Sequence, residues 1–164
     1  MNQDEFDKVE APAIAQLVSL GWEYISGKDL SPSSKPSVNE SPEHIYADGK
    51  GERTYLRDVV LVKRLEAAIK RINPWISDEN LRKVSRDVTH PNFAALMEYN
   101  HAFSQTLVSY LSVEQDLGKG RKGQTVKLVD FDQPENNAFV CTSQFKIEGV
   151  NQKIIPYIVW FLNV

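Results

Sequence analysis

The sequence predicts an α+β fold, in which N-terminal and central helices cover a mainly antiparallel sheet. Up to residue 117, apolar residues recur at three- and four-residue spacing, which is typical of amphipathic helices. Beyond it, short runs of β-branched and aromatic residues alternate with turn residues, and the run 154–164 is almost continuously apolar, as expected of a buried strand. Helices followed by a meander of strands are typical of the α+β class.

The composition predicts one folded domain of 164 residues, with 41% hydrophobic and 25% charged residues. The net charge of −3 gives no global basic field, so contact with DNA would have to be local or depend on a metal ion or a partner. The single cysteine, Cys141, excludes an internal disulfide framework and predicts a buried structural thiol in a reducing cytoplasm. No signal peptide and no membrane-spanning apolar run is present, so we expect a soluble cytoplasmic protein without membrane contact.

The first predicted element is a helix that ends at Gly21, a residue suited to a helix C-terminus. Pro12 removes one backbone hydrogen bond, so we expect a kink there or a regular helix that begins near Glu10 or Ala11. A short strand or extended segment over 22–25 follows. The apolar stripe of the helix consists of Phe6, Val9, Ala13, Leu17 and Leu20.

Residues 27–53 predict a long surface loop, because serine, proline and glycine are frequent and periodicity is absent. Three helices come next. The first runs from about 56 to 72 and ends at Asn73-Pro74. The second is capped by Ser77, and the third has Pro91 in its first turn.

A basic loop over 118–123 separates these helices from three predicted strands at 126–131, 138–147 and 154–164. The last of these runs leaves a hydrophobic edge with no covering element after it. We therefore expect a single domain over 1–164 that is the truncated front part of a longer protein.

Few side chains in this sequence predict catalysis. The basic loop supplies Lys119, Arg121 and Lys122, which either form a solvated approach to a hairpin or contact a DNA backbone. It is not a P-loop, because it precedes a strand instead of following one. The three histidines are far apart in the sequence and are interpreted as surface or helix-capping residues: His44, His90 and His101.

The sequence leaves the roles of three carboxylates open. Asp130 and Asp132 flank Phe131 at a predicted strand end, where they could hold Mg²⁺ or form a solvated turn, which is the commoner role. Glu10 stands one position away from the apolar stripe of the first helix. Spacing alone favours solvent exposure for Glu10.

Several short motifs occur in one order along nearly the whole chain. They are Glu10 through Gly21-Trp22-Glu23-Tyr24, Arg57-Asp58-Val59-Val60-Leu61 running into Arg71-Ile72-Asn73-Pro74, Asn100 with Phe103, Leu128-Val129-Asp130-Phe131 with Asn136-Asn137-Ala138-Phe139, Gln144-Phe145, and Pro156-Tyr157-Ile158-Val159 ending at Asn163. In this order the chain resembles the N-terminal domain of the restriction (R) subunit of type I restriction-modification enzymes.

The resemblance implies an incomplete restriction-endonuclease-like core of the PD-(D/E)xK kind, which binds Mg²⁺ through carboxylates to cleave phosphodiesters. Glu10 matches the helix carboxylate that often completes such a site, and so becomes a candidate catalytic and metal-binding residue. Tyr157 stands where the family has its metal-binding Asp, and a neutral phenol is a poor Mg²⁺ ligand. The family's Glu-x-Lys strand and its ATP-dependent motor have no counterpart in these residues. We therefore expect that the chain alone does not cut DNA.

The resemblance also implies partners, namely DNA and the modification and specificity subunits of a type I complex. An alternative function is a non-enzymatic module that docks on DNA or on the modification subunits through its helical layer or its basic loop. A third interpretation is a structural α+β domain whose likeness to the family is limited to the fold.

Overall fold

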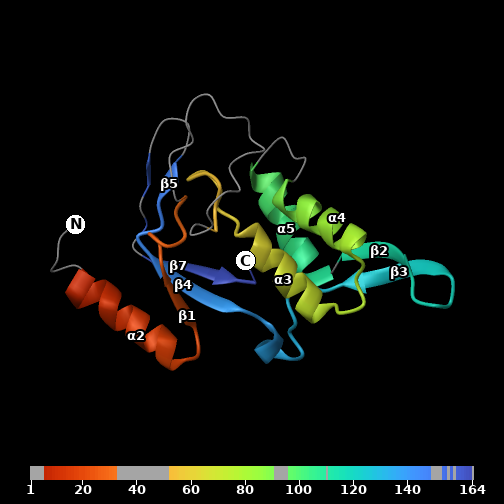
Figure 1. Cartoon of the computed structure of the whole chain (residues 1–164), viewed down its shortest axis with the longest axis horizontal. Helices are drawn as coiled ribbons and strands as arrows, with labels where there is room; N and C mark the ends of the chain where they lie inside the picture. The colour runs from red at the N-terminus through yellow and green to blue at the C-terminus, as the bar shows by residue number, and fades with distance from the viewer. Residues whose placement is uncertain are drawn as a thin grey trace. The chain divides into compact units, whose positions relative to one another are not determined.

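The computed structural model describes residues 6–32, 52–90, 96–109, 111–148, 153–154, 156 and 158–163. The chain divides into two compact units. We call Met1–Leu61 with Phe139–Phe161 the sheet unit, and Val62–Ala138 with Leu162–Val164 the helical unit. Figure 1 shows the elements of both. None of the helices in the described ranges has the length and apolar character that crossing a membrane requires.

The sheet unit opens with a π-helical turn, η1 (Phe6–Glu10), that continues into the α-helix α2 (Ala11–Ser19). The predicted start near Glu10 or Ala11 is confirmed, since Pro12 lies in the first turn of α2, where its missing N–H costs no helical bond. The predicted end is also confirmed. Gly21 has a φ of +90°, its N–H donates to the Val18 carbonyl (3.0 Å), and the next N–H, of Trp22, donates to the Leu17 carbonyl (3.1 Å).

A three-stranded sheet has the order β1-β4-β7, formed by β1 (Glu23–Ser26), β4 (Phe139–Ser143) and β7 (Ile158–Leu162). A separate antiparallel pair joins β5 (Ile147–Glu148) to β6 (Lys153–Ile154). In Figure 1, α2 lies beside β1. The α+β class is confirmed, but β1 and β4 run parallel, with Glu23 opposite Val140. The sequence pattern does not predict this parallel pair.

The core of the sheet unit reaches into the segment predicted as a long surface loop. Residues 33–51 of that segment lie outside the described residues. At its described ends, however, Leu30 is fully buried and Arg53 is 4% exposed, so these two positions do not belong to a surface loop. The buried apolar residues of the unit are Leu30, Leu61, Val140, Cys141, Phe145 and Phe161.

The described residues of the helical unit form the α-helices α3 (Val62–Ile72), α4 (Asp78–Thr89) and α5 (Leu96–Ser109). The predicted cap of α4 is confirmed, because the Ser77 hydroxyl accepts the Asn80 N–H at 3.3 Å. The predicted end of α3 before Asn73-Pro74 is confirmed as well, but its predicted start is wrong. Residues 56–61 are not helical, because the Asp58 carboxylate accepts the Tyr55 N–H (2.8 Å) in a local turn that competes with the helix. The predicted first turn of the third helix, at Pro91, lies outside the described residues.

An antiparallel hairpin follows α5, formed by β2 (Leu111–Asp116) and β3 (Arg121–Val126). The predicted strand at 126–131 is wrong, since β3 ends at Val126. Beyond it, the N–H of Lys127 bonds to the Asn73 side chain (2.9 Å) and the Leu128 carbonyl bonds to the Asn163 side chain (3.0 Å), so side chains replace a neighbouring strand. A short 3₁₀ turn, η3 (Pro134–Asn136), precedes β4. The core of the unit comprises Leu65, Ala68, Ile69, Ile76, Val84, Val113, Val126, Leu128 and Val129.

Candidate functional site

Glu10 is buried, with 1% of its surface exposed, although helical spacing favours solvent exposure for it. The expectation of exposure is therefore wrong. The reason is local: Glu10 closes the π-helical turn η1, whose wider turn does not follow the 3.6-residue period assumed by the spacing argument. Two residues of the predicted apolar stripe, Val9 and Leu20, are in turn exposed.

The buried carboxylate of Glu10 is only half satisfied. The side-chain amide of Gln144 donates to Glu10 Oε1 at 2.7 Å, while Glu10 Oε2 is buried and has no hydrogen-bond partner among the described residues. Gln144 follows the last residue of β4 and has a φ of +58°, a conformation that non-glycine residues seldom adopt. A buried oxygen without a donor costs free energy, so Glu10 Oε2 is an acceptor still available to a ligand.

Glu10 Oε2 satisfies only part of what the Mg²⁺ site implied by the resemblance requires. One buried carboxylate oxygen fits one ligand position of a hard cation, but Mg²⁺ takes six oxygen ligands. Nowhere in the described residues do three His, Cys, Asp or Glu side chains lie close enough to share a metal ion. Tyr157, the other predicted site position, lies outside the described residues. The described side chains alone therefore do not make a metal centre.

The Asp130 and Asp132 pair forms a turn instead of a cation site. Asp130 Oδ1 accepts the backbone N–H groups of Asp132 and Gln133, both at 3.2 Å, and Oδ2 accepts the side-chain amide of Asn136 at 2.9 Å. The hydrogen bond from Asn136 is the main reason that the pKa of Asp130 lies below its usual value. Asp132 is exposed and pairs with Lys127 at 2.6 Å. The turn-forming part of the interpretation is confirmed, but Asp130 is 7% exposed and so is not solvated as expected.

Two further predictions concern single side chains. Cys141 is fully buried in β4, and burial raises the pKa of its thiol, so it is a structural residue and not a nucleophile. His90 caps the C-terminus of α4, its N–H donating to the Arg86 carbonyl at 2.8 Å, and His101 is exposed on α5. His44 lies outside the described residues.

The residues of the predicted basic loop do not share one face. Residues 117–120 form the turn between β2 and β3, whereas Arg121 and Lys122 belong to β3. In the hairpin register Arg121 is opposite Asp116 and Lys122 is opposite Gln115, so the two cations point to opposite faces of the ribbon. All three predicted side chains, including Lys119 in the turn, are exposed.

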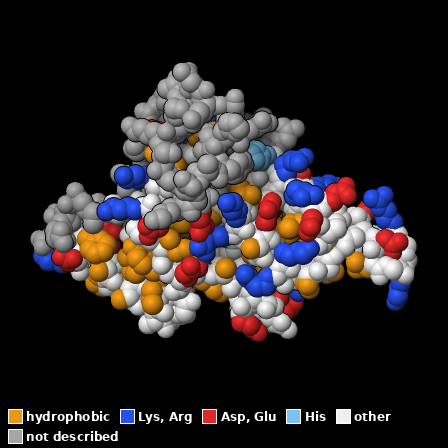
Figure 2. Space-filling view, in the orientation of Figure 1, with side chains coloured by type: hydrophobic (Ala, Val, Ile, Leu, Met, Phe, Trp, Pro, Cys, Tyr) orange, Lys and Arg blue, Asp and Glu red, His pale blue; other side chains and the backbone are white. Residues whose placement is uncertain are grey.

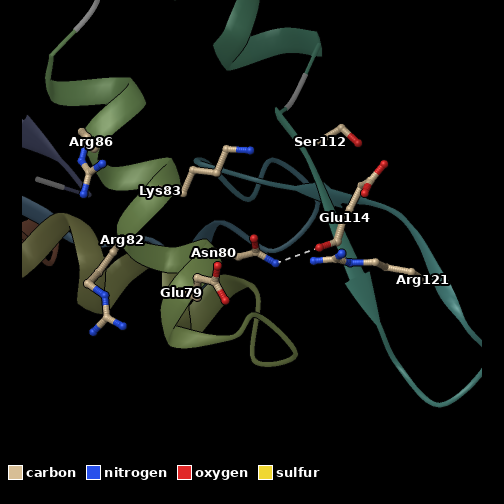
Figure 3. A pocket seen from close by; sticks show the side chains of 8 residues that line it. All are labelled: Glu79, Asn80, Arg82, Lys83, Arg86, Ser112, Glu114 and Arg121. Atoms are coloured by element: carbon tan, nitrogen blue, oxygen red, sulfur yellow. Dashed lines mark hydrogen bonds between the residues drawn. The ribbon is translucent and has the colours of Figure 1, made fainter.

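Arg121 shares a surface hollow with three cations that sequence reasoning missed, Arg82, Lys83 and Arg86 of α4 (Figure 3). The hollow has a volume of about 610 Å³. One face of α4 carries positions 79, 82, 83 and 86, because they recur at helical spacing. This spacing is the sequence pattern from which the cluster could have been predicted. The full lining is Glu79, Asn80, Arg82, Lys83, Arg86, Ser112, Glu114 and Arg121.

Comparison with known proteins shows a family to which the chain is similar over nearly its whole length. A family model described as the type I restriction enzyme R protein N terminus matches residues 2–163. The type I restriction enzyme HindI endonuclease subunit of Haemophilus influenzae is 33% identical over 156 residues, which are 94% of this chain and 14% of that protein. A protein of Methanocaldococcus jannaschii, provisionally named as the type I restriction enzyme MjaIXP endonuclease subunit, is 31% identical over 140 residues, 85% of this chain and 12% of that protein. The chain thus spans less than one sixth of the length of each relative.

Proposed function

The chain belongs to the family of type I restriction enzyme R protein N termini, and from this membership we propose that it forms the N-terminal part of a DNA-cleaving restriction subunit. The observation that carries the proposal is the family match over 2–163, supported by two relatives named as endonuclease subunits. DNA would be the substrate of the whole subunit. The modification and specificity subunits of a type I complex would be its partners, in the cytoplasm.

The proposal includes a restriction on what these residues do by themselves. The family implies a Mg²⁺-dependent nuclease, and the half-satisfied carboxylate of Glu10 supports a role for this residue as one metal ligand. Tyr157 stands at the position of the family's metal-binding Asp and cannot offer a carboxylate. We therefore propose that the 164 residues do not cleave DNA alone, and that ATP is used only by motor domains of the intact subunit.

Metal binding and cleavage by the 164-residue chain test this function. Calorimetric titration with Mg²⁺ and Mn²⁺ should give no binding for the unmodified chain, and supercoiled plasmid should stay intact. Tyr157→Asp restores the carboxylate that the family has at this position, so metal binding should appear. The double variant Tyr157→Asp with Glu10→Gln should lose it again.

Two outcomes would contradict the proposal. Nicking of plasmid by the unmodified chain that stops in EDTA would show that Tyr157 does not disable the site. Equal metal binding by Tyr157→Asp and by the double variant would remove Glu10 from the site. Circular dichroism of all variants checks that each is folded.

A second candidate function, a non-enzymatic module that docks on DNA or on the modification subunits, is favoured by one observation. The hollow between α4 and the β2–β3 hairpin is lined by four cations and two carboxylates. The two functions are compatible, since a subunit that cleaves DNA must also hold it.

A further inference from the structure

We propose that the outer face of α4 together with Arg121 of β3 is a binding surface for the phosphates of duplex DNA. We call the set Arg82, Lys83, Arg86 and Arg121 the cation band. The inference rests on the proposed function for its choice of DNA as the partner. The position of the surface follows from the structure of the helical unit alone.

The helix side of the cation band is held rigidly. Val84 and Ser85 are buried on the inner face of α4, which packs against α3, so Arg82, Lys83 and Arg86 are directed to solvent. The acidic residues Asp78 and Glu79 occupy the first turn of the helix, where they oppose the positive end of its dipole. A packed inner face fixes where the three cations stand.

The hairpin side is bonded to the same helix. The side-chain amide of Asn80 donates to the Glu114 carbonyl (3.2 Å) and to Gln115 Oε1 (3.0 Å), and the Ser77 N–H donates to the same Gln115 oxygen at 2.9 Å. These bonds join β2 to the N-terminal turn of α4. Arg121 shares its ribbon face with Ser112 and Glu114, so its position relative to the helix is set before any ligand arrives.

The four cations of the band outnumber the two carboxylates, Glu79 and Glu114, that line the same hollow. Among the described residues, none of its four cations makes an ion pair, although Glu79 and Glu114 line the same hollow. Elsewhere in the helical unit cations do pair, as Lys70 does with Asp78 at 3.2 Å. Unpaired cations gathered on one surface leave a positive potential that attracts an anion.

The shape of the surface favours a polymer over a small ligand. Figure 3 shows Lys83 extending from α4 toward β2 and Arg121 pointing back from β3 toward Asn80, while Arg82 and Arg86 project from α4 farther from the hairpin. The cations therefore form a band and do not surround one point. Figure 2 shows lysine and arginine side chains recurring over α4, β2 and β3, with acidic side chains between them. Small-molecule sites are concave and mostly apolar, whereas arginine-lined bands suit successive phosphates.

The cation band is tested by fluorescence anisotropy of a labelled duplex of about 20 base pairs with the 164-residue chain, from about 50 to 200 mM salt. Arg121→Gln should weaken binding about three- to tenfold and lower the slope of log K against log salt by about 0.9. The triple variant Arg82→Gln, Lys83→Gln, Arg86→Gln should lower the slope by about 2.7. Arg121→Lys should retain most of the affinity, because it keeps the charge.

The matched control is Lys122→Gln, which removes the same charge from the opposite face of the same strand and should change affinity less than about twofold. Equal losses in Lys122→Gln and Arg121→Gln would overturn the cation band, and so would unchanged binding in the triple variant. Equally effective competition by polyglutamate, compared per charge, would also overturn it, because the surface would then be a general anion exchanger. Absence of any duplex binding would overturn the cation band. It would not decide the proposed function, which the metal titration of Tyr157→Asp tests separately, so failure of the band and failure of the function are distinguishable.

Discussion

The two units secure their irregular segments with different buried polar groups. In the sheet unit a single charged side chain, Arg53, donates to four backbone carbonyls and stacks on Phe145 with its guanidinium 3.8 Å from the ring centre. In the helical unit neutral amides bind the backbone instead, namely those of the buried Asn73 and Asn163 and of the half-buried Asn137. The four carbonyls that Arg53 contacts are those of Leu30, Leu56, Asp58 and Lys146.

The charged guanidinium and the neutral amides differ in the free energy that each loses on burial away from water. Burial lowers the pKa of Arg53, and the Asp58 carboxylate opposes the effect. In the part of the chain that the structure describes, the buried Nη2 atom of Arg53 has no hydrogen-bond partner. An amide carries no net charge and both donates and accepts, so it satisfies N–H and C=O groups at once. The buried charge of Arg53 therefore binds more carbonyls than one amide does, and its removal should lower the free energy of unfolding more.

The largest expected effect comes from Arg53→Met, which keeps an apolar stem over Phe145 but leaves four carbonyls without their donor. We expect the free energy of unfolding to fall by about 3 to 5 kcal/mol, measured by urea denaturation. Arg57→Met is the control, since Arg57 is exposed and stacks on Tyr55, with its guanidinium 4.6 Å from the ring centre. A fall in the free energy of unfolding of less than about 1 kcal/mol for Arg53→Met would contradict the difference inferred between the two units.

A smaller effect is expected from Asn163→Ala in the helical unit. The Asn163 side chain accepts the Ala138 N–H at 2.7 Å and donates to the Leu128 carbonyl, and its φ of +57° disfavours alanine. We expect a loss of about 2 to 3 kcal/mol, from the broken bonds and the strained backbone together. Asn163→Gly separates the two causes, because glycine accepts the positive φ but restores no hydrogen bond. If Asn163→Ala and Asn163→Gly are equally unstable, the backbone conformation contributes nothing.

The smallest expected effect is on the pH dependence of stability. It concerns Asp130, which binds backbone N–H groups of the helical unit through a charged side chain and not through a neutral amide. The hydrogen bond from Asn136 lowers the pKa of Asp130 in the folded state, so the carboxylate stabilises the fold at pH values above the ordinary aspartate pKa of about 4. That contribution is lost as the pH falls through the lower, folded-state pKa. Thermal unfolding midpoints between about pH 5 and pH 2 should therefore fall more steeply for the unmodified chain than for Asp130→Asn. Parallel curves would contradict the prediction.

Sequence patterns predicted the features whose causes are local. Gly21 at the end of α2, Ser77 before α4 and Asn73-Pro74 after α3 all act through bonds to residues a few positions away. The α+β class follows from the same local periodicities, and the family followed from motifs read in order. These features depend on neighbours in the chain, so they are visible without coordinates.

Features that depend on distant residues were missed. The burial of Glu10 depends on a π-helical turn and on Gln144, which lies at the far end of β4. The strand expected at 126–131 was lost because Asn73 and Asn163 bind the backbone there. The cation band joins α4 to Arg121 only through the hairpin register, which charge counts do not contain.

The parallel pairing of β1 with β4 also sets an order of events during synthesis. Between these two strands the chain passes through residues 62–138, which hold α3, α4, α5 and both strands of the β2–β3 hairpin. That stretch can gain its helices and its hairpin as it leaves the ribosome, because their contacts are close in sequence. β1 is made earlier but must wait for β4, because its partner residues 140–143 are synthesised only after that stretch. We therefore expect the helical unit to gain structure before the sheet unit does, although the sheet unit contains the first residues to be made.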